Sequence, residues 1–315
     1  MAATAGTLVT RHEPRLFRRI WQRSALSLRI GAMILLAHFV IAAVGWVWTP
    51  FGYALMGTGI PLSGMSWTHP FGVDQLGRDV LSRAVYASHI DILLSLGGTF
   101  AGLVIGAVLG LLSGYLRGPV DEVLQRLNET LISIPFLVLA LIAIAAAGPQ
   151  WAGNPGLVIA VVTLVYAPRV SRMARSAAIE IAARDFITVA RLRGESPLSV
   201  MWHELLPNAT GVLLVEFALR AGYAPILIGS LGFLGFGMRP PTPEWGLIVA
   251  DNRNVLMISP VTVLGPGVML ASLVVGLNLF TEGLARILGR TVRINEAIVT
   301  LTSSGDVGPG GRLHC

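Results

Sequence analysis

The chain has 315 residues, of which 54% are hydrophobic and only 13% are charged. A soluble globular protein carries about 25% charged residues, so this composition excludes soluble and disordered proteins and indicates an integral membrane protein. All 23 basic residues are arginine. The missing lysine excludes an ATP-binding P-loop and lysine Schiff-base chemistry, because both need that side chain.

The net charge of +6 comes from arginines that are dispersed among apolar stretches. This pattern favours orientation in an anionic lipid membrane and gives no indication of nucleic-acid binding. The only cysteine is Cys315. A disulfide within the chain and a cysteine-based metal site are therefore both excluded.

Stretches without charged residues predict an all-α, polytopic membrane protein with six transmembrane helices. A crossing needs about 20 apolar residues, and a Gly148-Pro149-Gln150 turn divides the longest stretch into two crossings. Residues 1–29 precede the first crossing, residues 49–91 form a loop after it, and residues 92–291 make up the core with the remaining crossings. The six expected spans are residues 30–48, 92–113, 131–147, 156–173, 210–235 and 262–283.

The distribution of arginine predicts the orientation of these spans. Six arginines precede the first span, and six more lie at the end of span four or between spans four and five. The connections on the opposite side hold only Arg78, Arg83, Arg239 and Arg253. The positive-inside rule then places both termini in the cytoplasm of a multi-pass inner-membrane protein, with residues 49–91 outside. Residues 292–315 are polar and rich in glycine, and we expect a disordered cytoplasmic tail.

The largest cytoplasmic connection is expected at residues 174–209. Asp185 is suited to cap a short helix that Gly194 closes, and Ser196-Pro197 opens a second helix that stops at Leu206-Pro207. Two short helices joined at a bend predict a compact knob (residues 185–207) that docks a cytoplasmic partner. An amphipathic element that lies on the lipid headgroups is the alternative.

Four motifs in this order resemble a known family. They are 69–83 His-Pro-Phe-Gly-Val-Asp-Gln-Leu-Gly-Arg-Asp-Val-Leu-Ser-Arg; 185–191 Asp-Phe-Ile-Thr-Val-Ala-Arg with Gly194 and 206–208 Leu-Pro-Asn; 230–237 Ser-Leu-Gly-Phe-Leu-Gly-Phe-Gly with 240–246 Pro-Pro-Thr-Pro-Glu-Trp-Gly; and 278–284 Asn-Leu-Phe-Thr-Glu-Gly-Leu after Pro266-Gly267. They resemble the permeases of ABC importers, specifically the C-type subunit of the dipeptide, oligopeptide and nickel branch. The resemblance covers about residues 69–286 and departs from the family at Thr188, Ile228 and Ala285.

The resemblance implies a type I importer bundle with defined partners. These would be a second homologous permease, two cytoplasmic ABC ATPase domains, an extracytoplasmic substrate-binding protein and the membrane lipid. ATP and Mg²⁺ would bind the ATPase partners, and this chain would hold no cofactor. The solute would be a peptide or a similar small molecule such as nickel or haem. The ATPase-coupling loop would include Asp185, Ala190, Gly194, His203, Glu204, Leu206 and Pro207.

Two further groups of residues are candidates for the pathway and its gate. Glu216 and Arg220 lie four residues apart in span five, so they share a helix face and are able to pair. They either line the translocation path or form a self-neutralising pair near the headgroups. The glycine-rich end of the span marks either an outer gate or simple helix termination. Its candidate gate residues are Ser230, Gly232, Gly235 and Gly237.

The external loop carries charges at helical spacing. Asp74 with Arg78 and Asp79 with Arg83 are each four residues apart. We expect a charged helix face that either docks the binding protein or is simply solvated.

Enzymatic and other transport classes receive less support. The chain lacks HExxH and GxSxG, and its histidines are not spaced as metal ligands on one helix. Catalysis in this chain is therefore not expected. An ion-gradient-driven secondary transporter is the alternative function, although inverted repeats and mid-span acidic groups are not apparent. A membrane-anchored scaffold without transport is a third possibility.

Overall fold

The computed structural model describes residues 26–304, and this part of the chain is helical without strands. Five helices are long and apolar enough to cross a membrane, and a bent pair of helices makes a sixth if it counts as one span. The α-helices are α2 Leu26–Val47, α3 Val80–Leu116, α4 Gly118–Ser133, α5 Phe136–Ala147, α6 Pro155–Ala182, α7 Asp185–Leu192, α8 Pro197–Val200, α9 Leu206–Phe233, α10 Trp245–Asn252 and α11 Val261–Ser304.

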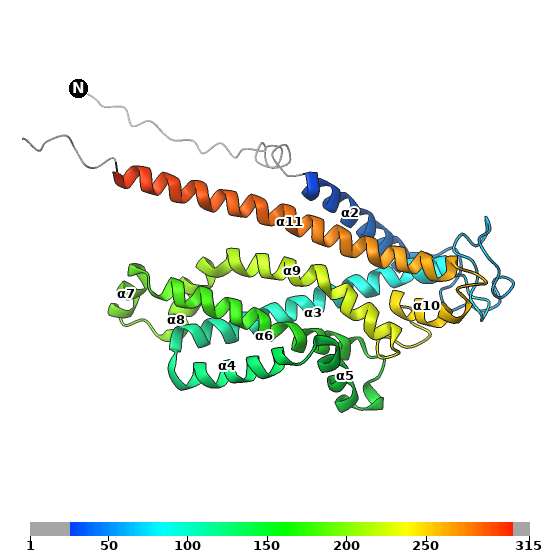
Figure 1. The fold of residues 1–315 in the computed structure, drawn as a ribbon, viewed down its shortest axis with the longest axis horizontal. Coiled ribbons are helices and arrows are strands. Elements are labelled where there is room, and N and C mark those ends of the chain that lie inside the picture. The colour runs from blue at the N-terminus through cyan, green and yellow to red at the C-terminus, as the bar shows by residue number, and fades with distance from the viewer. Residues whose placement is uncertain (1–25, 305–315) are drawn as a thin grey trace, which may run out of the picture.

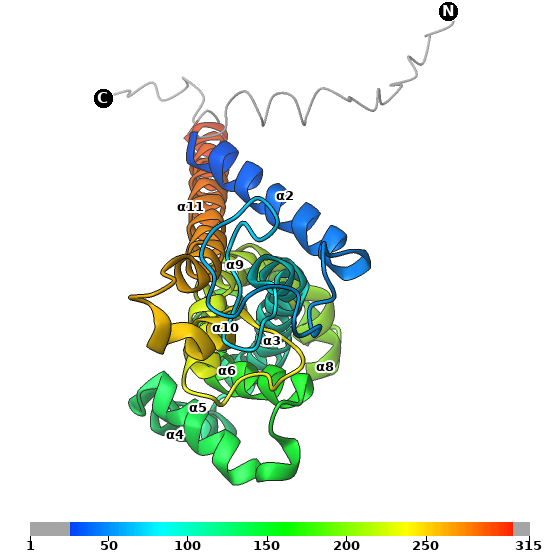
Figure 2. The same ribbon diagram turned by 90° about the vertical axis from the view of Figure 1, so that its right-hand side faces the viewer.

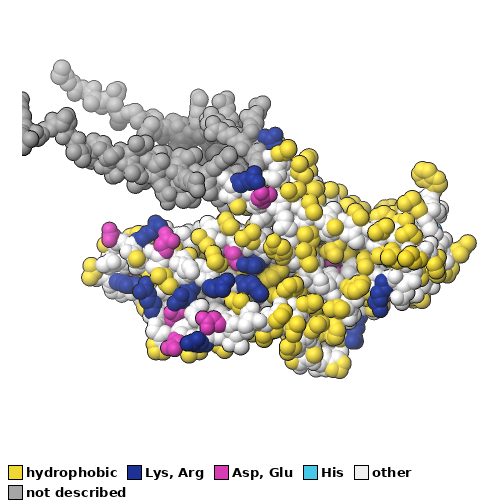
Figure 3. Space-filling view, in the orientation of Figure 1, with side chains coloured by type: hydrophobic (Ala, Val, Ile, Leu, Met, Phe, Trp, Pro, Cys, Tyr) yellow, Lys and Arg dark blue, Asp and Glu magenta, His cyan; other side chains and the backbone are white. Residues whose placement is uncertain are grey.

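Helices α3, α6 and α9 form the centre of the bundle, with α2 and α11 on one side and α4 on the other (Figure 1). Helices α7 and α8 lie at one end, and the long loop before α3 lies with α10 at the other. Figure 2 shows the same arrangement along the bundle axis. In the space-filling view, charged side chains gather toward the end that carries α7 and α8, while apolar side chains cover most of the remaining face (Figure 3).

A glycine stripe allows α3 and α6 to pack closely. Glycine recurs at every fourth position, and the stripe therefore lies along one face of α3. A Cβ atom added at Gly106 would lie 2.6 Å from the Ala167 carbonyl oxygen and 2.6 Å from Val170 Cβ. The two backbones approach in the manner of small-residue contacts between membrane helices. The stripe consists of Gly98, Gly102, Gly106, Gly110 and Gly114.

Helix α11 joins the outer helix α2 to the centre. Gly31 of α2 lies against the backbone of α11 around Phe280. On the opposite face of α11, Thr281 Oγ1 donates to the Ala218 carbonyl at 3.0 Å and links α11 to α9. These contacts fix the first and last spans as a pair against the bundle.

The expected third span, residues 131–147, is wrong as a straight crossing. The chain breaks at Ile134–Pro135, and the axes of α4 and α5 differ by 101°. Helix α4 lies along α6, where Asp121 accepts two hydrogen bonds of 2.6 Å from Arg175. Because Pro135 cannot donate a backbone hydrogen bond and disfavours helix before it, the apolar run cannot continue through this point.

Two other span boundaries differ from those expected. Helix α3 begins at Val80, 12 residues before the predicted start at residue 92, because its charged residues are buried among polar partners. Helix α11 continues through Ser304, so residues 292–304 are not the disordered tail that we expected. Residues 292–304 contain neither glycine nor proline, and both recur after Ser304. The structure does not describe residues 1–25 or residues 305–315, which include Cys315.

Candidate coupling and translocation sites

The knob is anchored to the ends of three central helices. Ile187, Ala190, Val200 and Leu205 are fully buried and pack with apolar side chains of α3, α6 and α9. Gly194 adopts φ +79°, which a residue with a side chain rarely adopts, and its N–H donates to the Arg191 carbonyl at 3.0 Å. The knob is therefore a rigid extension of the bundle.

The first of the two expected knob helices is confirmed with a small change at its start. Helix α7 begins at Asp185, but Arg184 is the N-cap, and the Asp185 side chain makes no cap hydrogen bond. Ser196 caps α8 as expected, because its Oγ accepts from the Ser199 N–H at 3.2 Å. Pro197 occupies the first position of that helix.

The predicted stop at Leu206-Pro207 is wrong. One continuous helix runs from Pro197 to Phe233, and a π-helical turn at Met201–Leu205 lies just before the proline. Pro207 has no N–H to donate, and its ring crowds the preceding turn. A wider π turn accommodates such a residue and often marks a functional position.

The remaining coupling candidates are polar and lie on the outside of this turn. His203 is exposed, and its Nδ1 lies 3.0 Å from the Ser199 carbonyl oxygen. Glu204 Oε1 lies 4.0 Å from Arg193 Nη2, and its side chain is partly exposed. Their side chains therefore remain accessible to a partner beside the knob.

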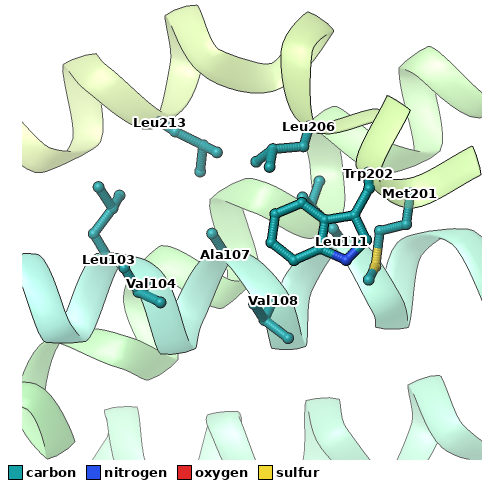
Figure 4. Close-up of a pocket in the computed structure, with 9 residues that line it drawn as sticks. All are labelled: Leu103, Val104, Ala107, Val108, Leu111, Met201, Trp202, Leu206 and Leu213. Atoms are coloured by element: carbon teal, nitrogen blue, oxygen red, sulfur yellow. The ribbon is translucent and has the colours of Figure 1, made fainter. Parts of the chain in front are cut away.

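An apolar cavity of about 200 Å³ lies beneath the π turn (Figure 4). Helix α3 contributes Leu103 and Val108, the turn contributes Trp202, and α9 contributes Leu206 and Leu213. The cavity leaves space between α3 and the start of α9. Side chains therefore do not completely fill the contact between these two helices.

The outward side of the knob exposes apolar side chains. Leu192 is 83% exposed, and Val189, Leu198 and Trp202 are each more than half exposed. These residues project from the same segments whose opposite sides are buried against the bundle. Large apolar side chains exposed together on one segment are typical of a protein interface.

Glu216 and Arg220 form the expected pair on α9. Arg220 Nε lies 2.7 Å from Glu216 Oε1, and Nη2 lies 2.5 Å from the same oxygen. The Glu216 side chain is buried, while that of Arg220 is one quarter exposed. Arg220 lies 23 residues after Pro197 and 13 before Phe233 in this continuous helix, so the pair is away from both helix ends.

The glycine-rich signature ends α9 with a defined cap. Gly235 adopts φ +81°, its N–H donates to the Gly232 carbonyl at 3.0 Å, and the Phe236 N–H donates to the Leu231 carbonyl at 2.8 Å. This pair of hydrogen bonds is a Schellman motif. Helix termination therefore accounts for Gly235, whereas a role of the segment as an outer gate stays a prediction.

Gly232 and Gly237 have a packing role beside this cap. A Cβ atom at Gly232 would collide with the Glu244 carboxylate, and one at Gly237 would lie 2.7 Å from Gly232 Cα. Glu244 is fully buried and caps α10 by accepting from the Gly246 and Leu247 N–H groups. The two halves of the signature thus pack together. Ser230 is partly buried, and its hydroxyl donates to the Ile226 carbonyl at 2.7 Å.

Burial raises the pKa of Glu244 to about 8. The carboxyl group is shielded from water and lies beside a second buried carboxyl group, Asp91. Burial disfavours the charged form of a carboxylic acid. Sequence analysis did not single out this pair, because its members are 153 residues apart and meet only in the fold.

The charges of the external loop face inward. Asp74 Oδ2 accepts from Arg78 Nε at 2.6 Å and from Arg83 Nη1 at 2.7 Å. Arg83 Nη2 donates to Asp251 Oδ2 at 3.0 Å and links the start of α3 to α10. The expected pairing of Asp74 with Arg78 is present, but Asp74 and both arginines are no more than 5% exposed. They do not form the exposed charged face that the spacing indicated.

Asp79 has a different partner from the one expected. Its Oδ2 accepts from the Ser82 N–H at 2.7 Å and caps α3, and its Oδ1 lies 2.9 Å from His69 Nδ1. The Asp79–Arg83 pair is therefore not formed. Large apolar side chains of this loop are exposed instead, since Ile60, Met65 and Trp67 are 70% exposed or more. Docking of a binding protein by the loop stays a prediction.

Comparison with known proteins agrees with this architecture. Residues 106–294 match the family of binding-protein-dependent transport system inner membrane components. The dipeptide transport system permease protein DppC of Alkalihalophilus pseudofirmus is 31% identical over 255 residues, which are 81% of this chain and 83% of the relative. The chain belongs to this family of inner-membrane transport components. The family assignment favours an importer permease over an ion-driven secondary transporter.

Other members of the family also match most of the chain. DppC of Haemophilus influenzae is 34% identical over 220 residues, covering 68% of this chain and 71% of the relative. The peptide transport system permease protein SapC of Escherichia coli is 31% identical over 281 residues, which are 87% of this chain and 94% of the relative. These relatives are transport permeases by name.

The fold is that of an importer permease. The structure of the MetNI methionine ABC transporter in inward-facing conformations matches with a TM-score of 0.53 and 20% sequence identity. The match covers 65% of this chain and 96% of the compared chain. The expected all-α importer-permease bundle is therefore confirmed. In this chain, the knob lies at one end of the bundle, and the long loop lies with α10 at the other end (Figure 1).

Proposed function

We propose that this chain is one of two permease subunits of an ATP-driven importer of di- or oligopeptides. Relatives named as dipeptide, di/tripeptide and peptide permeases match it over most of its length, which supports a peptide as solute. The second permease, two ATPase domains and a substrate-binding protein complete the assembly. ATP and Mg²⁺ bind the ATPase partners, and both termini of this chain are cytoplasmic.

The exposed apolar side of the knob is the observation that carries this proposal. Its buried side is fixed to α3, α6 and α9, so a force on its exposed side moves these helices together. A cytoplasmic ATPase that closes on ATP would push here and rock the bundle as a rigid body. The apolar external loop, with Ile60, Met65 and Trp67, faces the binding protein at the opposite end.

Substitution of the most exposed knob residue tests the proposal. In proteoliposomes that hold the complete transporter, Leu192→Ser lowers ATP-driven uptake of labelled dialanine, because the ATPase contact loses its apolar anchor. Leu264→Ser is the matched control, since Leu264 is 57% exposed on α11, away from the knob. Removal of one apolar anchor weakens association about tenfold.

The two competing outcomes are distinct. Reduced uptake with altered stimulation of ATP hydrolysis supports coupling through the knob. A membrane-anchored scaffold instead predicts that Leu192→Ser releases a partner while ATP hydrolysis is unchanged and uptake is absent even in the wild type.

A further inference from the structure

A basic cavity lies where α5, α6 and α9 meet. It has a volume of about 160 Å³ and is lined by the side chains of Tyr166, Arg169, Arg220 and Tyr223, among others. A water molecule occupies about 30 Å³ of liquid. The cavity therefore has room for a polar group at the end of a ligand.

Both arginines lie well inside long helices. Arg169 lies 14 residues after Pro155 and 13 before Ala182 in α6, and Arg220 lies 23 residues after Pro197 and 13 before Phe233 in the continuous helix that includes α9. At 1.5 Å per residue, each is about 20 Å or more from either end of its helix. Ionisable residues in such positions are costly and are functional candidates by default.

The cavity carries an uncompensated positive charge. Glu216 neutralises Arg220 and holds its guanidinium group by the two short contacts described above. Arg169 Nη1 donates to the Val165 carbonyl oxygen at 2.7 Å, and no ion pair joins Arg169 to a carboxylate in the described part of the chain. The two guanidinium groups also repel each other. An anionic group in the cavity would offset this repulsion.

The cavity opens beside an exposed face of α9. Tyr223 is 53% exposed, Ile226 is 41% exposed and Phe233 is 43% exposed, at spacings that place them on one side of the helix. This face leads from the arginines toward the glycine-rich end of α9. A solute that moves along it passes the two arginines midway.

We infer that Arg169 and Arg220 form a transient binding site for the C-terminal carboxylate of the transported peptide. The inference rests on the proposed function. A guanidinium group binds a carboxylate through two parallel hydrogen bonds, which provides both charge and geometry. Glu216 positions Arg220, and by neutralising one of the two charges it keeps the site weak enough to release its ligand.

The test measures uptake and ATP hydrolysis by the complete transporter in proteoliposomes, with dialanine supplied on a saturating amount of its binding protein. Arg169→Gln removes the unneutralised charge and lowers the uptake of dialanine about tenfold, as expected for one charge-assisted hydrogen bond. ATP hydrolysis stimulated by the loaded binding protein is retained, because the knob is unchanged. Arg172→Gln is the matched control, since Arg172 is exposed one turn further along α6 and leaves uptake unchanged.

Two additional measurements separate binding from a structural role. Arg169→Lys keeps the charge but loses the two-pronged geometry, so uptake is intermediate between the wild type and Arg169→Gln. The wild type also imports dialanine faster than dialanine amide, and Arg169→Gln removes this preference. Arg169→Lys provides the same comparison should Arg169→Gln fail to assemble.

Three results would overturn the inference. Unchanged uptake in Arg169→Gln excludes a contribution of this charge. If Arg169→Gln loses uptake and ATP hydrolysis in parallel, and the uptake of dialanine and dialanine amide falls equally, the role of Arg169 is structural. A wild-type transporter that imports neither peptide contradicts the proposed function as well, whereas the first two results leave that function intact.

Discussion

The close contact between α3 and α6 gives a quantitative prediction for Gly106→Ala. The added Cβ would lie 2.6 Å from the Ala167 carbonyl oxygen and 2.6 Å from Val170 Cβ, where ordinary contacts begin at 3.4 Å. The two helices must therefore move apart by nearly the difference between these distances, and overpacking of this kind costs about 1–3 kcal/mol. The higher helix propensity of alanine offsets about 1 kcal/mol of this cost. The net effect is destabilisation.

Gly97→Ala is the matched control on the same helix. Its Cβ would meet only the flexible end of Ile159, at 3.5 Å, so the substitution gains helix propensity without a clash. Thermal unfolding of the purified permease in detergent, followed by tryptophan fluorescence at one scan rate, compares the two. We expect the Tm of Gly106→Ala to be several degrees below that of Gly97→Ala, at about 2–4 °C for each kcal/mol. An equal or higher Tm for Gly106→Ala would refute the close packing of α3 on α6.

Two further substitutions test buried charges. Asp74→Asn removes the carboxylate charge that the buried Arg78 and Arg83 share, and destabilises the permease by about 3–5 kcal/mol. Arg126→Gln breaks an exposed pair and changes the free energy of unfolding by less than about 1 kcal/mol. Similar Tm values for these two variants would contradict the buried network. Because the folded-state pKa of Glu244 is raised from 4.5 to about 8, the contribution of Glu244 to stability is greatest below pH 4.5, falls as the pH rises to about 8 and then levels off. The Tm of Glu244→Gln relative to that of the wild type therefore rises across this pH range, and a constant difference would show that Glu244 does not titrate in the folded protein.

The spans were predictable wherever an apolar run coincides with a helix, since the hydrocarbon core of the membrane imposes that pattern. The prediction failed where charge or proline made the pattern misleading. Arg83 and Asp91 were counted as part of a loop, yet both are buried within α3 by partners distant in sequence. The bend before α5 follows from Pro135, a local signal that the apolar composition of the run concealed.

The candidate sites were predictable to a similar, partial degree. Gly194 and Ser196-Pro197 mark the knob because they act locally, through a left-handed turn and a helix cap. The glycine stripe on α3 was also visible in the sequence, as glycine at every fourth position, but was not recognised. Arg169 was treated only as an orientation signal after an apolar run. Its place in a cavity with Arg220 depends on how α6 packs against α9, which no local pattern reveals.

The composition of the complex formed by the native protein is the most direct test of the central claim that this chain is an ATP-driven importer permease. The chain is tagged, extracted from membranes in mild detergent and analysed for copurifying proteins, with cross-linking at the knob. We expect a second polytopic permease and an ATPase that carries a Walker motif, with the ATPase cross-linked to residues 185–207. Recovery of the chain alone or as a homo-oligomer, without an ATPase even after cross-linking, would contradict the account.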